Sequence, residues 1–263
     1  MIAIPLQAAR LPPRVCPPTL APTGRLRDVV CQCENGSFAM KIIIGNRNYS
    51  SWSLRGWLAA KQSLLPFETE LVVMDTPEWI SGAAKANMPS GKVPVLWDHG
   101  EAIWDSLAIL LYLSDKAGHD RFWPRDPKAR ALAYASCAEM HSGFAALRAG
   151  CPMDLQHHAP AFVPTPDIIA DVQRIESLWE QALGRFGVES GEPWLFGRFG
   201  AADIMFAPVC ARIETYHLPV GDTARAYAGR VLAHPFVAEW RGEALQEEFP
   251  FTRYAMPGLE KRR

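Results

Sequence analysis

Short apolar runs alternate with helical periods along the first half of the chain. Residues 41–45, KIIIG, and 67–74, FETELVVM, are runs rich in β-branched residues, which predict strands. Between them, residues 51–63 carry apolar side chains at helical spacing, and residues 77–87, which begin with a proline, predict a second, short helix. From residue 41 onward the pattern therefore predicts a strand, a helix, a strand and a helix.

Two further apolar runs enclose a tight turn. Residues 93–104, VPVLWDHGEAIW, place Gly100 in a polar turn between two strand-like runs, which predicts a β-hairpin. Residues 105–118 predict a helix that is capped by Asp105 or Ser106. The order β-α-β-α-β-β-α predicts a small mixed sheet, in which the first crossover joins parallel strands and the last two strands are antiparallel.

The second half of the chain is helical in pattern. Helical periods cover residues 126–149, 166–186, 201–216, 223–231 and 235–247. No strand pattern occurs among them, and residues 157–166 form a loop between the first two long helices. We therefore expect an α/β domain over residues 40–119, an all-α domain over residues 126–248 and a solvated tail over residues 249–263.

Residues 1–39 differ from the rest of the chain. They contain six prolines and no periodic apolar pattern, so they cannot bury enough surface to fold and are expected to be disordered. Met40 opens a stretch that resembles a natural domain start, and the preceding segment is interpreted as an upstream extension outside the native protein. A transit peptide is the weaker alternative.

Composition narrows the class of partner. A net charge of -1, with 49% hydrophobic and 21% charged residues, describes a globular protein without a strong field for nucleic acid or anionic membrane. No apolar run approaches the roughly 20 residues of a membrane helix. The six cysteines form no metal-type cluster with histidines and are interpreted as free thiols. These observations favour a cytoplasmic protein without a metal, which binds a small molecule or another folded chain.

Three local features are candidates for chemistry. Hydroxyl side chains crowd residues 48–57, NYSSWSLRGW, directly after the first strand. Pro94 enters the third strand, where proline is disfavoured, and a cis Val93–Pro94 bond would turn the backbone of Val93 toward a peptide-like ligand. Asp105 and Ser106 lie at the start of a helix, whose N-terminus favours an anion, although such a pair is commonly an ordinary cap.

Together these features resemble the cytosolic glutathione S-transferases, in particular bacterial members of the serine type. The resemblance covers residues 40–247 and rests on four stretches, NYSSWSLRGW, NMPSGKVPVLWDHGEAIWDSLAILLYL, FWPRDPKARA and WLFGRFGAADIMFAPV. It implies a thioredoxin-like N-terminal domain, an all-α C-terminal domain, and glutathione as co-substrate. It further implies a homodimer and a role in detoxification.

The family resemblance also implies how glutathione binds. Val93 would pair its backbone with the cysteinyl unit across cis-Pro94, while Asp105 and Ser106 would hold the γ-glutamyl end. Lys92 can reach the glycine carboxylate, although a solvated lysine at a strand edge is the alternative.

The same resemblance indicates the catalytic group. Serine-type classes share the pattern S-x-x-x-x-R at the start of the first helix, and Ser50 and Arg55 match it. Ser50 would donate to the glutathione thiolate: lowering a thiol pKa by two units requires roughly 2.7 kcal/mol, and a hydrogen bond to a charged group contributes about 1.5–3 kcal/mol. One hydroxyl donor therefore suffices. Tyr49 is the rival donor, Ser51 is expected to cap the helix, and Ser53 is expected to be a supporting hydroxyl.

By the same analogy, the first long helix of the second domain lines the acceptor pocket. Its candidates are Tyr134, Met140, His141, Phe144 and Arg148. Their chemistry indicates a small apolar electrophile, with Arg148 available for an anionic group, although core packing is the alternative for the apolar members. Residues 199–209 resemble the family's folding motif, with Gly200 in place of the usual Ser or Thr cap and Asp203 retained.

Two other functions stay open on the sequence alone. A glutathione-dependent isomerase of the zeta type is the closest enzymatic rival, although Trp52 replaces the cysteine of its SSC motif. A non-catalytic protein that binds glutathione or apolar ligands is the other, because a fold does not by itself establish an activity.

Overall fold

The computed structural model describes residues 40–187, 194–249 and 258–262. The predictions for residues 1–39 lie outside these ranges. The first half contains β1 (Met40–Ile44), α1 (Ser51–Ser63), β2 (Glu68–Leu71), α2 (Pro77–Ser81), the 3₁₀ turn η1 (Ala83–Lys85), β3 (Val95–Asp98), β4 (Glu101–Ile103) and α3 (Ser106–Ala117). The second half contains η2 (His119–Arg121), α4 (Pro127–Ser142), α5 (Ala145–Gly150), β5 (His157–His158), α6 (Pro166–Phe186), α7 (Ala201–Tyr216), α8 (Asp222–Ala233), α9 (Pro235–Leu245) and β6 (Glu260–Lys261).

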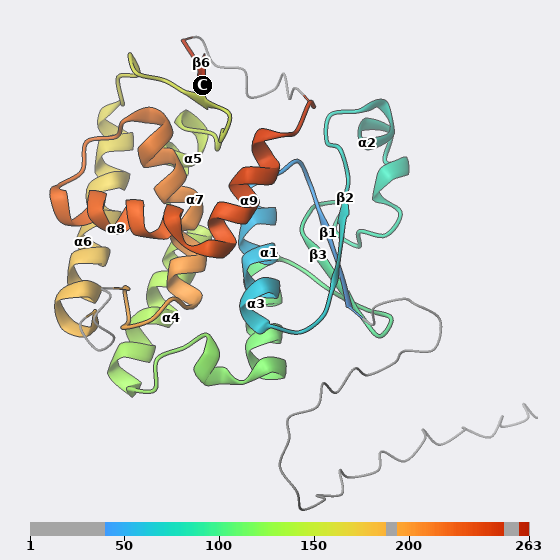
Figure 1. The fold of residues 1–263 in the computed structure, drawn as a ribbon, viewed down its shortest axis with the longest axis horizontal. Helices are drawn as coiled ribbons and strands as arrows, with labels where there is room; N and C mark the ends of the chain where they lie inside the picture. The colour runs from blue at the N-terminus through green and yellow to red at the C-terminus, as the bar shows by residue number, and fades with distance from the viewer. Residues whose placement is uncertain (1–39, 188–193, 250–257, 263) are drawn as a thin grey trace, which may run out of the picture. The chain divides into compact units, whose positions relative to one another are not determined.

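Four strands form one sheet in the order β2-β1-β3-β4 (Figure 1). β1 pairs in parallel with β2 and antiparallel with β3, and β3 pairs antiparallel with β4. The predicted β-α-β-α-β-β-α order, the parallel first crossover and the final hairpin are thereby confirmed. The hairpin turns at His99 and Gly100, which have positive φ angles of 48° and 88°, a region that glycine adopts without steric penalty.

Successive side chains of β1 point to opposite faces of the sheet. Ile42 and Ile44 are buried in the main core, which includes residues of α1 and α3. Ile43 is buried in a smaller cluster on the other face with Val95, and Trp79 of α2 packs against that cluster. The run of isoleucines is therefore apolar throughout because both faces of β1 are covered.

α1 lies close to the loop that leads into β3. A Cβ atom added to Gly56 would lie 2.8 Å from Cγ of Pro94, which is closer than side chains approach one another. Glycine at this position therefore permits α1 to pack directly against Pro94.

One core joins α1 and α3 to the helices of the second half, and Figure 1 shows these two helices side by side next to the sheet. Leu54 of α1, Leu110 of α3, Met140 of α4 and Ile204 of α7 are at most 1% exposed and belong to a single buried cluster. The apolar faces of these helices are thus explained by their packing against one another. No helix in the described part of the chain combines the length and the apolar character that a membrane crossing requires.

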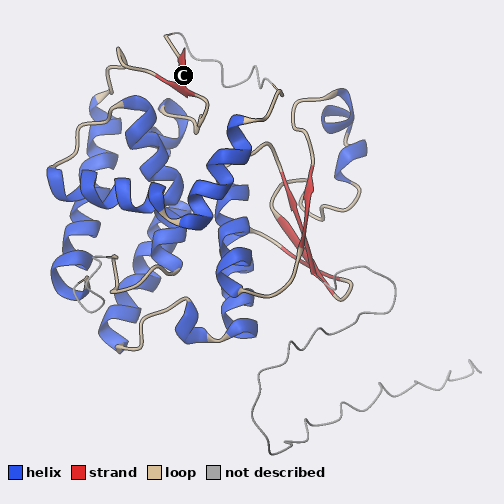
Figure 2. Cartoon of the chain, in the orientation of Figure 1, coloured by secondary structure: helices blue, strands red, loops and turns tan. Residues whose placement is uncertain are grey.

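After α3 the described chain consists mainly of helices and loops (Figure 2). The single long helix expected over residues 126–149 is wrong, because the segment forms α4 and α5 with a break at Gly143 and Phe144. Phe144 has a left-handed φ of 62°. Arg148 Nε donates to the Gly143 carbonyl over 2.9 Å, and its guanidinium also donates to the Met140 carbonyl. The guanidinium thus satisfies carbonyls at the end of α4, where the helix can stop.

The expectation of no strand in the second half is also wrong. β5 pairs antiparallel with β6. Arg262 holds the pair in place: its Nε donates to the His157 carbonyl over 3.0 Å, and its Nη1 lies 2.6 Å from a carboxylate oxygen of Glu214. This part of the expected solvated tail is therefore attached to the helical half. Strands of two residues leave no periodic pattern in a sequence.

The start of α7 matches the predicted folding motif. Gly200 offers no capping side chain, but its N–H donates to the Asp203 carboxylate over 2.9 Å. The Tyr227 hydroxyl donates to the same carboxylate over 2.8 Å, and the Leu195 N–H adds a longer contact of 3.4 Å. The retained Asp203, which is 1% exposed, therefore organises the helix start without a Ser or Thr cap.

The Asp203 carboxyl makes stability depend on pH. Burial raises its pKa from 3.8 to about 6, although the hydrogen bonds from Tyr227, Gly200 and Leu195 favour the ionised form. Between about pH 4 and pH 6 the folded chain holds a proton that the unfolded chain has released. The free energy of unfolding should therefore fall as the pH rises through this window, by about 3 kcal/mol in total.

Thermal unfolding of the wild type and of Asp203→Asn from below pH 4 to pH 7 measures this effect. The asparagine variant does not titrate, so the difference in stability between the two proteins should change across the window and stay constant above it. Parallel pH profiles for the two proteins would contradict the prediction.

Candidate active site

The corner between β1 and α1 is built around hydroxyl groups. Ser50 has non-helical backbone angles, φ -83° and ψ 87°, and its Oγ accepts the N–H of Ser53 over 3.3 Å. Ser50 is therefore the N-cap of α1, and the expectation that Ser51 caps the helix is wrong, since Ser51 is its first residue. The Oγ atoms of Ser50 and Ser53 lie 2.8 Å apart, and Ser53 Oγ accepts the N–H of Gly45 over 3.0 Å.

Distant segments hold this corner in place. The Glu247 carboxylate accepts the N–H groups of Arg47 and Asn48, over 2.8 Å and 3.1 Å. Asn48 Oδ1 in turn accepts the N–H groups of Leu155 and Gln156, over 2.6 Å and 2.9 Å. The loop before α1 is thereby bonded both to the segment after α9 and to the loop after α5.

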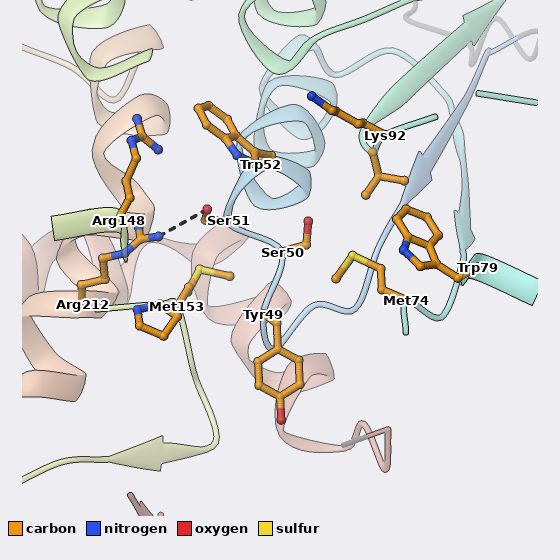
Figure 3. Close-up of a pocket in the computed structure, with 12 residues that line it drawn as sticks. Tyr49, Ser50, Ser51, Trp52, Met74, Trp79, Lys92, Arg148, Met153 and Arg212 are labelled. Atoms are coloured by element: carbon orange, nitrogen blue, oxygen red, sulfur yellow. Dashed lines mark hydrogen bonds between the residues drawn. The ribbon is translucent and has the colours of Figure 1, made fainter. Parts of the chain in front are cut away.

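A cavity of about 270 Å³ lies at this corner (Figure 3). Figure 3 shows that its lining residues lie on either side of Ser50. On one side is the sheet wall, which we define as Met74, Trp79, Lys92 and Val93. On the other side is the helical wall, which we define as Trp52, Arg148, Pro152, Met153 and Arg212. Tyr49, Ser50 and Ser51 complete the lining.

The sheet wall contains two of the residues expected to bind glutathione, Lys92 and Val93. The Val93–Pro94 peptide bond is cis, as the resemblance implies. Pro94 itself does not line the cavity and packs against Gly56 of α1. The structure thus brings the expected catalytic Ser50 and these two residues to one cavity.

Asp105 and Ser106 lie at the N-terminus of α3, outside the cavity lining. Of the two caps that the sequence left open, Asp105 is the one used: its Oδ1 accepts the N–H of Leu107 over 3.0 Å. Its Oδ2 lies 2.9 Å from Nε2 of His141. Ser106 is fully buried, and its hydroxyl has no hydrogen-bond partner within the described residues. Such an unpaired group is unusual, because buried hydroxyls are normally hydrogen-bonded.

The residues expected to line an acceptor pocket are separated in the structure. Arg148 belongs to the helical wall, and His141 contacts Trp52 of that wall with ring centroids 5.3 Å apart. Tyr134 lies elsewhere, with its hydroxyl bonded to the histidine of η2 over 2.8 Å. Phe144 is buried in the main core. Only part of the expected set is therefore brought to the cavity.

Arg148 and Arg212 of the helical wall, together with the buried Arg55, give this corner positive charge. The guanidinium carbons of Arg55 and Arg148 lie 4.8 Å and 4.6 Å from the ring centroid of Trp52. Arg212 donates to Ser51 Oγ over 3.4 Å, the dashed line in Figure 3. Burial lowers the pKa of Arg55 well below its ordinary value, and the like charges of Arg148 and Arg212 lower it further. An anion placed at this corner is therefore favoured electrostatically.

Tyr49, the rival donor, lines the cavity from a different direction. Figure 3 shows its hydroxyl pointing away from the hydroxyls of Ser50 and Ser51. This geometry favours Ser50 over Tyr49 as a donor to a ligand in the cavity.

The sequence does not predict six of the lining residues, which are Trp52, Met74, Trp79, Pro152, Met153 and Arg212. Arg212 lies in α7, 161 positions from the serine that it contacts. Its one signal in the sequence is a charged residue within the otherwise apolar run at 204–213. That signal indicates a buried polar role without saying where the side chain points.

The cysteines offer neither a nucleophile nor a metal site in the described part of the chain. Cys137, Cys151 and Cys210 are buried free thiols, as expected. Burial raises the pKa of the Cys151 thiol to about 12, which makes it a poor nucleophile. Within residues 40–187, 194–249 and 258–262, no group of three or more His, Cys, Asp or Glu side chains is placed to hold a metal ion.

Known proteins resemble the chain along most of the described residues. The family model for the N-terminal domain of glutathione S-transferases matches residues 49–116, and the model for the C-terminal domain matches residues 137–243. Glutathione S-transferase theta-1 of Bos taurus is 31% identical over 206 residues, which cover 73% of this chain and 80% of that protein. The theta-1 enzyme of Mus musculus is 29% identical over 191 residues, which cover 70% and 74%.

Solved structures share the fold. A glutathione transferase homologue from a Burkholderia strain, with bound glutathione, has a TM-score of 0.60 at 20% identity and covers 80% of this chain and 100% of its own. A theta class glutathione S-transferase from Xanthomonas axonopodis pv. citri, also with glutathione bound, has a TM-score of 0.54 at 24% identity and covers 81% and 99%. Taken with the two family models and the theta-1 relatives, the sheet, the helical half and the serine-capped first helix show that the chain belongs to the cytosolic glutathione S-transferase family.

Proposed function

We propose that this glutathione transferase joins the thiolate of glutathione to a small apolar electrophile. The proposal rests on the position of Ser50, whose side chain caps α1 and lines the cavity between the sheet wall and the helical wall. One wall suits glutathione and the other suits the acceptor. The reacting sulfur and carbon then meet at the Ser50 hydroxyl.

Glutathione is proposed to lie along the sheet wall. The backbone of Val93 pairs with the cysteinyl unit, and Lys92 attracts the glycine carboxylate. The γ-glutamyl end reaches the start of α3, where the Asp105 carboxylate suits the α-ammonium group and the partnerless hydroxyl of Ser106 suits the α-carboxylate. The ammonium group then shares Asp105 with His141.

Catalysis requires the sulfur to be a thiolate near neutral pH. Ser50 donates its O–H to the sulfur, and the N-terminus of α1 and the guanidinium groups beside Trp52 add favourable potential. The thiolate attacks the electrophilic carbon, a C–S bond forms, and the leaving group departs with the electrons of the bond that breaks. Ser50 stays a hydrogen-bond donor and forms no bond to the substrate.

The helical wall indicates the class of acceptor. Trp52, Pro152 and Met153 offer apolar surface, and Arg148 adds a positive charge beside the Trp52 ring. This combination supports an aromatic or otherwise apolar electrophile whose polar substituent meets Arg148. Tyr134 and Phe144 have no part in the proposal, because neither lines the cavity.

Family membership is the basis for further proposals about the location, the oligomeric state and the role of the protein. The protein is proposed to be a cytoplasmic homodimer that acts in detoxification, with no need for a metal, a nucleic acid or a membrane. Its domains are proposed to cover residues 40–119 and 126–248. In support of that division, the first half ends with α3 at Ala117 and the long helices of the second half begin with α4 at Pro127.

Two measurements test the proposed function. Retention on immobilised glutathione and calorimetric titration measure binding, and the turnover of 1-chloro-2,4-dinitrobenzene measures conjugation. We expect saturable binding and turnover above the uncatalysed rate. Binding without turnover of this or related electrophiles would favour a carrier, and cis-to-trans isomerisation of a maleyl compound without conjugation would favour the isomerase alternative.

A further inference from the structure

We infer that Ser53 is a positioning residue that aims the Ser50 hydroxyl at the thiolate, through a chain of hydrogen bonds that begins at the Gly45 N–H. The inference deepens the proposed function and rests on it. Ser53 itself does not line the cavity, so it acts through Ser50 and does not touch the substrate.

Three contacts place the two serines together. Ser53 Oγ accepts the Gly45 N–H over 3.0 Å, and it lies 2.8 Å from Ser50 Oγ. The Ser53 N–H donates to Ser50 Oγ over 3.3 Å. Ser53 is fully buried and Ser50 is 7% exposed, so water does not compete freely for these groups. The side chain of Ser53 has no other hydrogen-bond partner within the described residues.

The number of protons sets the direction of the bond between the two hydroxyls. A serine hydroxyl has one proton and two acceptor positions. A backbone N–H can only donate, so Gly45 occupies one acceptor position of Ser53. If Ser50 donated to the second acceptor position of the Ser53 oxygen, the Ser53 proton would be left buried without an acceptor, which is unfavourable. Ser53 therefore donates to Ser50.

With this direction, the proton of the Ser50 hydroxyl has only one way to point. In this arrangement one acceptor position of the Ser50 oxygen takes the N–H of Ser53 over 3.3 Å, and the other takes the O–H of Ser53, whose Oγ lies 2.8 Å away. Its own proton must point away from both donors, and the cavity that Ser50 lines is the open direction. Hydrogen bonds in a chain polarise one another, so Ser50 also becomes a stronger donor to the sulfur.

The first donor of the chain is fixed by close packing. A Cβ atom added to Gly45 would lie 2.7 Å from Sδ of Met74 and 3.0 Å from Cγ2 of Val93, and both residues belong to the sheet wall. Gly45 therefore brings the wall that is proposed to hold glutathione within van der Waals reach of the donor that orients the two serines.

The pKa of enzyme-bound glutathione tests the inference. It is measured from the ultraviolet absorbance of the thiolate in the complex as the pH is varied. In Ser53→Ala we expect this pKa to rise by about 0.5 unit, with a roughly threefold loss of kcat/KM below it. A merely structural role for Ser53 would lower the melting temperature without moving the pKa of the bound thiol.

Ser63→Ala is the matched control. Ser63 is also a buried serine of α1, 3% exposed, that accepts one backbone N–H, from Leu65 over 3.2 Å, and donates to the Ala60 carbonyl over 2.6 Å. It does not line the cavity. Its removal should cost stability while the pKa of bound glutathione stays at the wild-type value.

Each outcome decides the inference. A wild-type pKa in Ser53→Ala overturns it. If that variant does not fold, Ser53→Cys replaces it: a thiol is a weaker donor, so the bound pKa should again lie above the wild-type value, and an unchanged pKa overturns the inference. Ser50→Ala, titrated in parallel, distinguishes failure of this inference from failure of the proposed function. An unchanged pKa of bound glutathione in Ser50→Ala would overturn the assignment of Ser50 as the donor to the thiolate.

Discussion

Replacement of Ser50 by alanine should lower kcat/KM for glutathione conjugation by one to two orders of magnitude. The lost hydrogen bond to the thiolate contributes about 1.5–3 kcal/mol, which corresponds to a factor of about 10–150. The pKa of the bound thiol should rise by about one to two units. The deficit should therefore shrink as the pH is raised and the thiol ionises unaided. The pH profile of kcat/KM measures both effects.

A second helix cap provides the control for this variant. Ser50→Ala also removes the N-cap of α1, which costs about 1 kcal/mol of stability. Thr165 caps α6 in the same way, by accepting the Ile168 N–H over 3.4 Å, and does not line the cavity. Thr165→Ala should lose a similar stability and keep wild-type kcat/KM. Wild-type kcat/KM in Ser50→Ala would remove the catalytic assignment and bring Tyr49 or Ser51 forward.

Replacement of Arg55 by alanine should lower the free energy of unfolding by about 3–5 kcal/mol. Arg55 is fully buried, and its Nε donates over 2.8 Å to the carbonyl of Met205 in α7, 150 positions away. Its Nη1 makes a longer contact of 3.4 Å with the Ser51 carbonyl. Alanine leaves both a cavity and carbonyls without their charged donor. Urea unfolding at a constant m-value measures the loss through the midpoint.

Two further variants separate the causes of that loss. Arg55→Met fills most of the volume but donates no hydrogen bond. The fall in the free energy of unfolding that remains in Arg55→Met is therefore the part due to hydrogen bonding. Arg174→Ala removes an exposed arginine that makes two short bonds to Glu139, 2.7 Å and 2.9 Å, and should cost no more than about 1 kcal/mol. A loss in Arg55→Ala no larger than that of Arg174→Ala would contradict the prediction.

Features fixed by neighbouring residues were predictable from the sequence. The strand before Ser50, the hairpin at Gly100 and the α7 start at Asp203 each follow from the local period, the turn chemistry or the capping geometry. The spacing of Ser50 and Arg55 belongs to the same class, because Ser50 caps the helix that carries Arg55. What the sequence could not settle was which of two adjacent serines caps that helix, since either hydroxyl can do so and a shift of one residue decides it.

Features that depend on distant residues were not predictable. The end of α4 at Gly143 depends on the guanidinium of Arg148, which satisfies carbonyls only after α5 has folded back. The helical wall needs Arg212 from α7 beside Trp52 from α1, and no local pattern relates the two. Tyr134 has the chemistry of a pocket residue, but its hydroxyl is bonded to η2. The helical period predicts which face of a helix a residue lies on, but not which element packs opposite that face.

Asn48 and Arg47 are bonded to residues that are synthesised much later, Leu155 and Glu247. Contacts of such sequence separation form slowly, because closing the intervening loops costs entropy before any contact is gained. The serine corner should therefore become native late, and on the ribosome it cannot close until the segment after α9 has emerged. A folding intermediate can thus possess the sheet, the hairpin and most helices and still be inactive, so that recovery of activity reports completion of folding more strictly than recovery of secondary structure does.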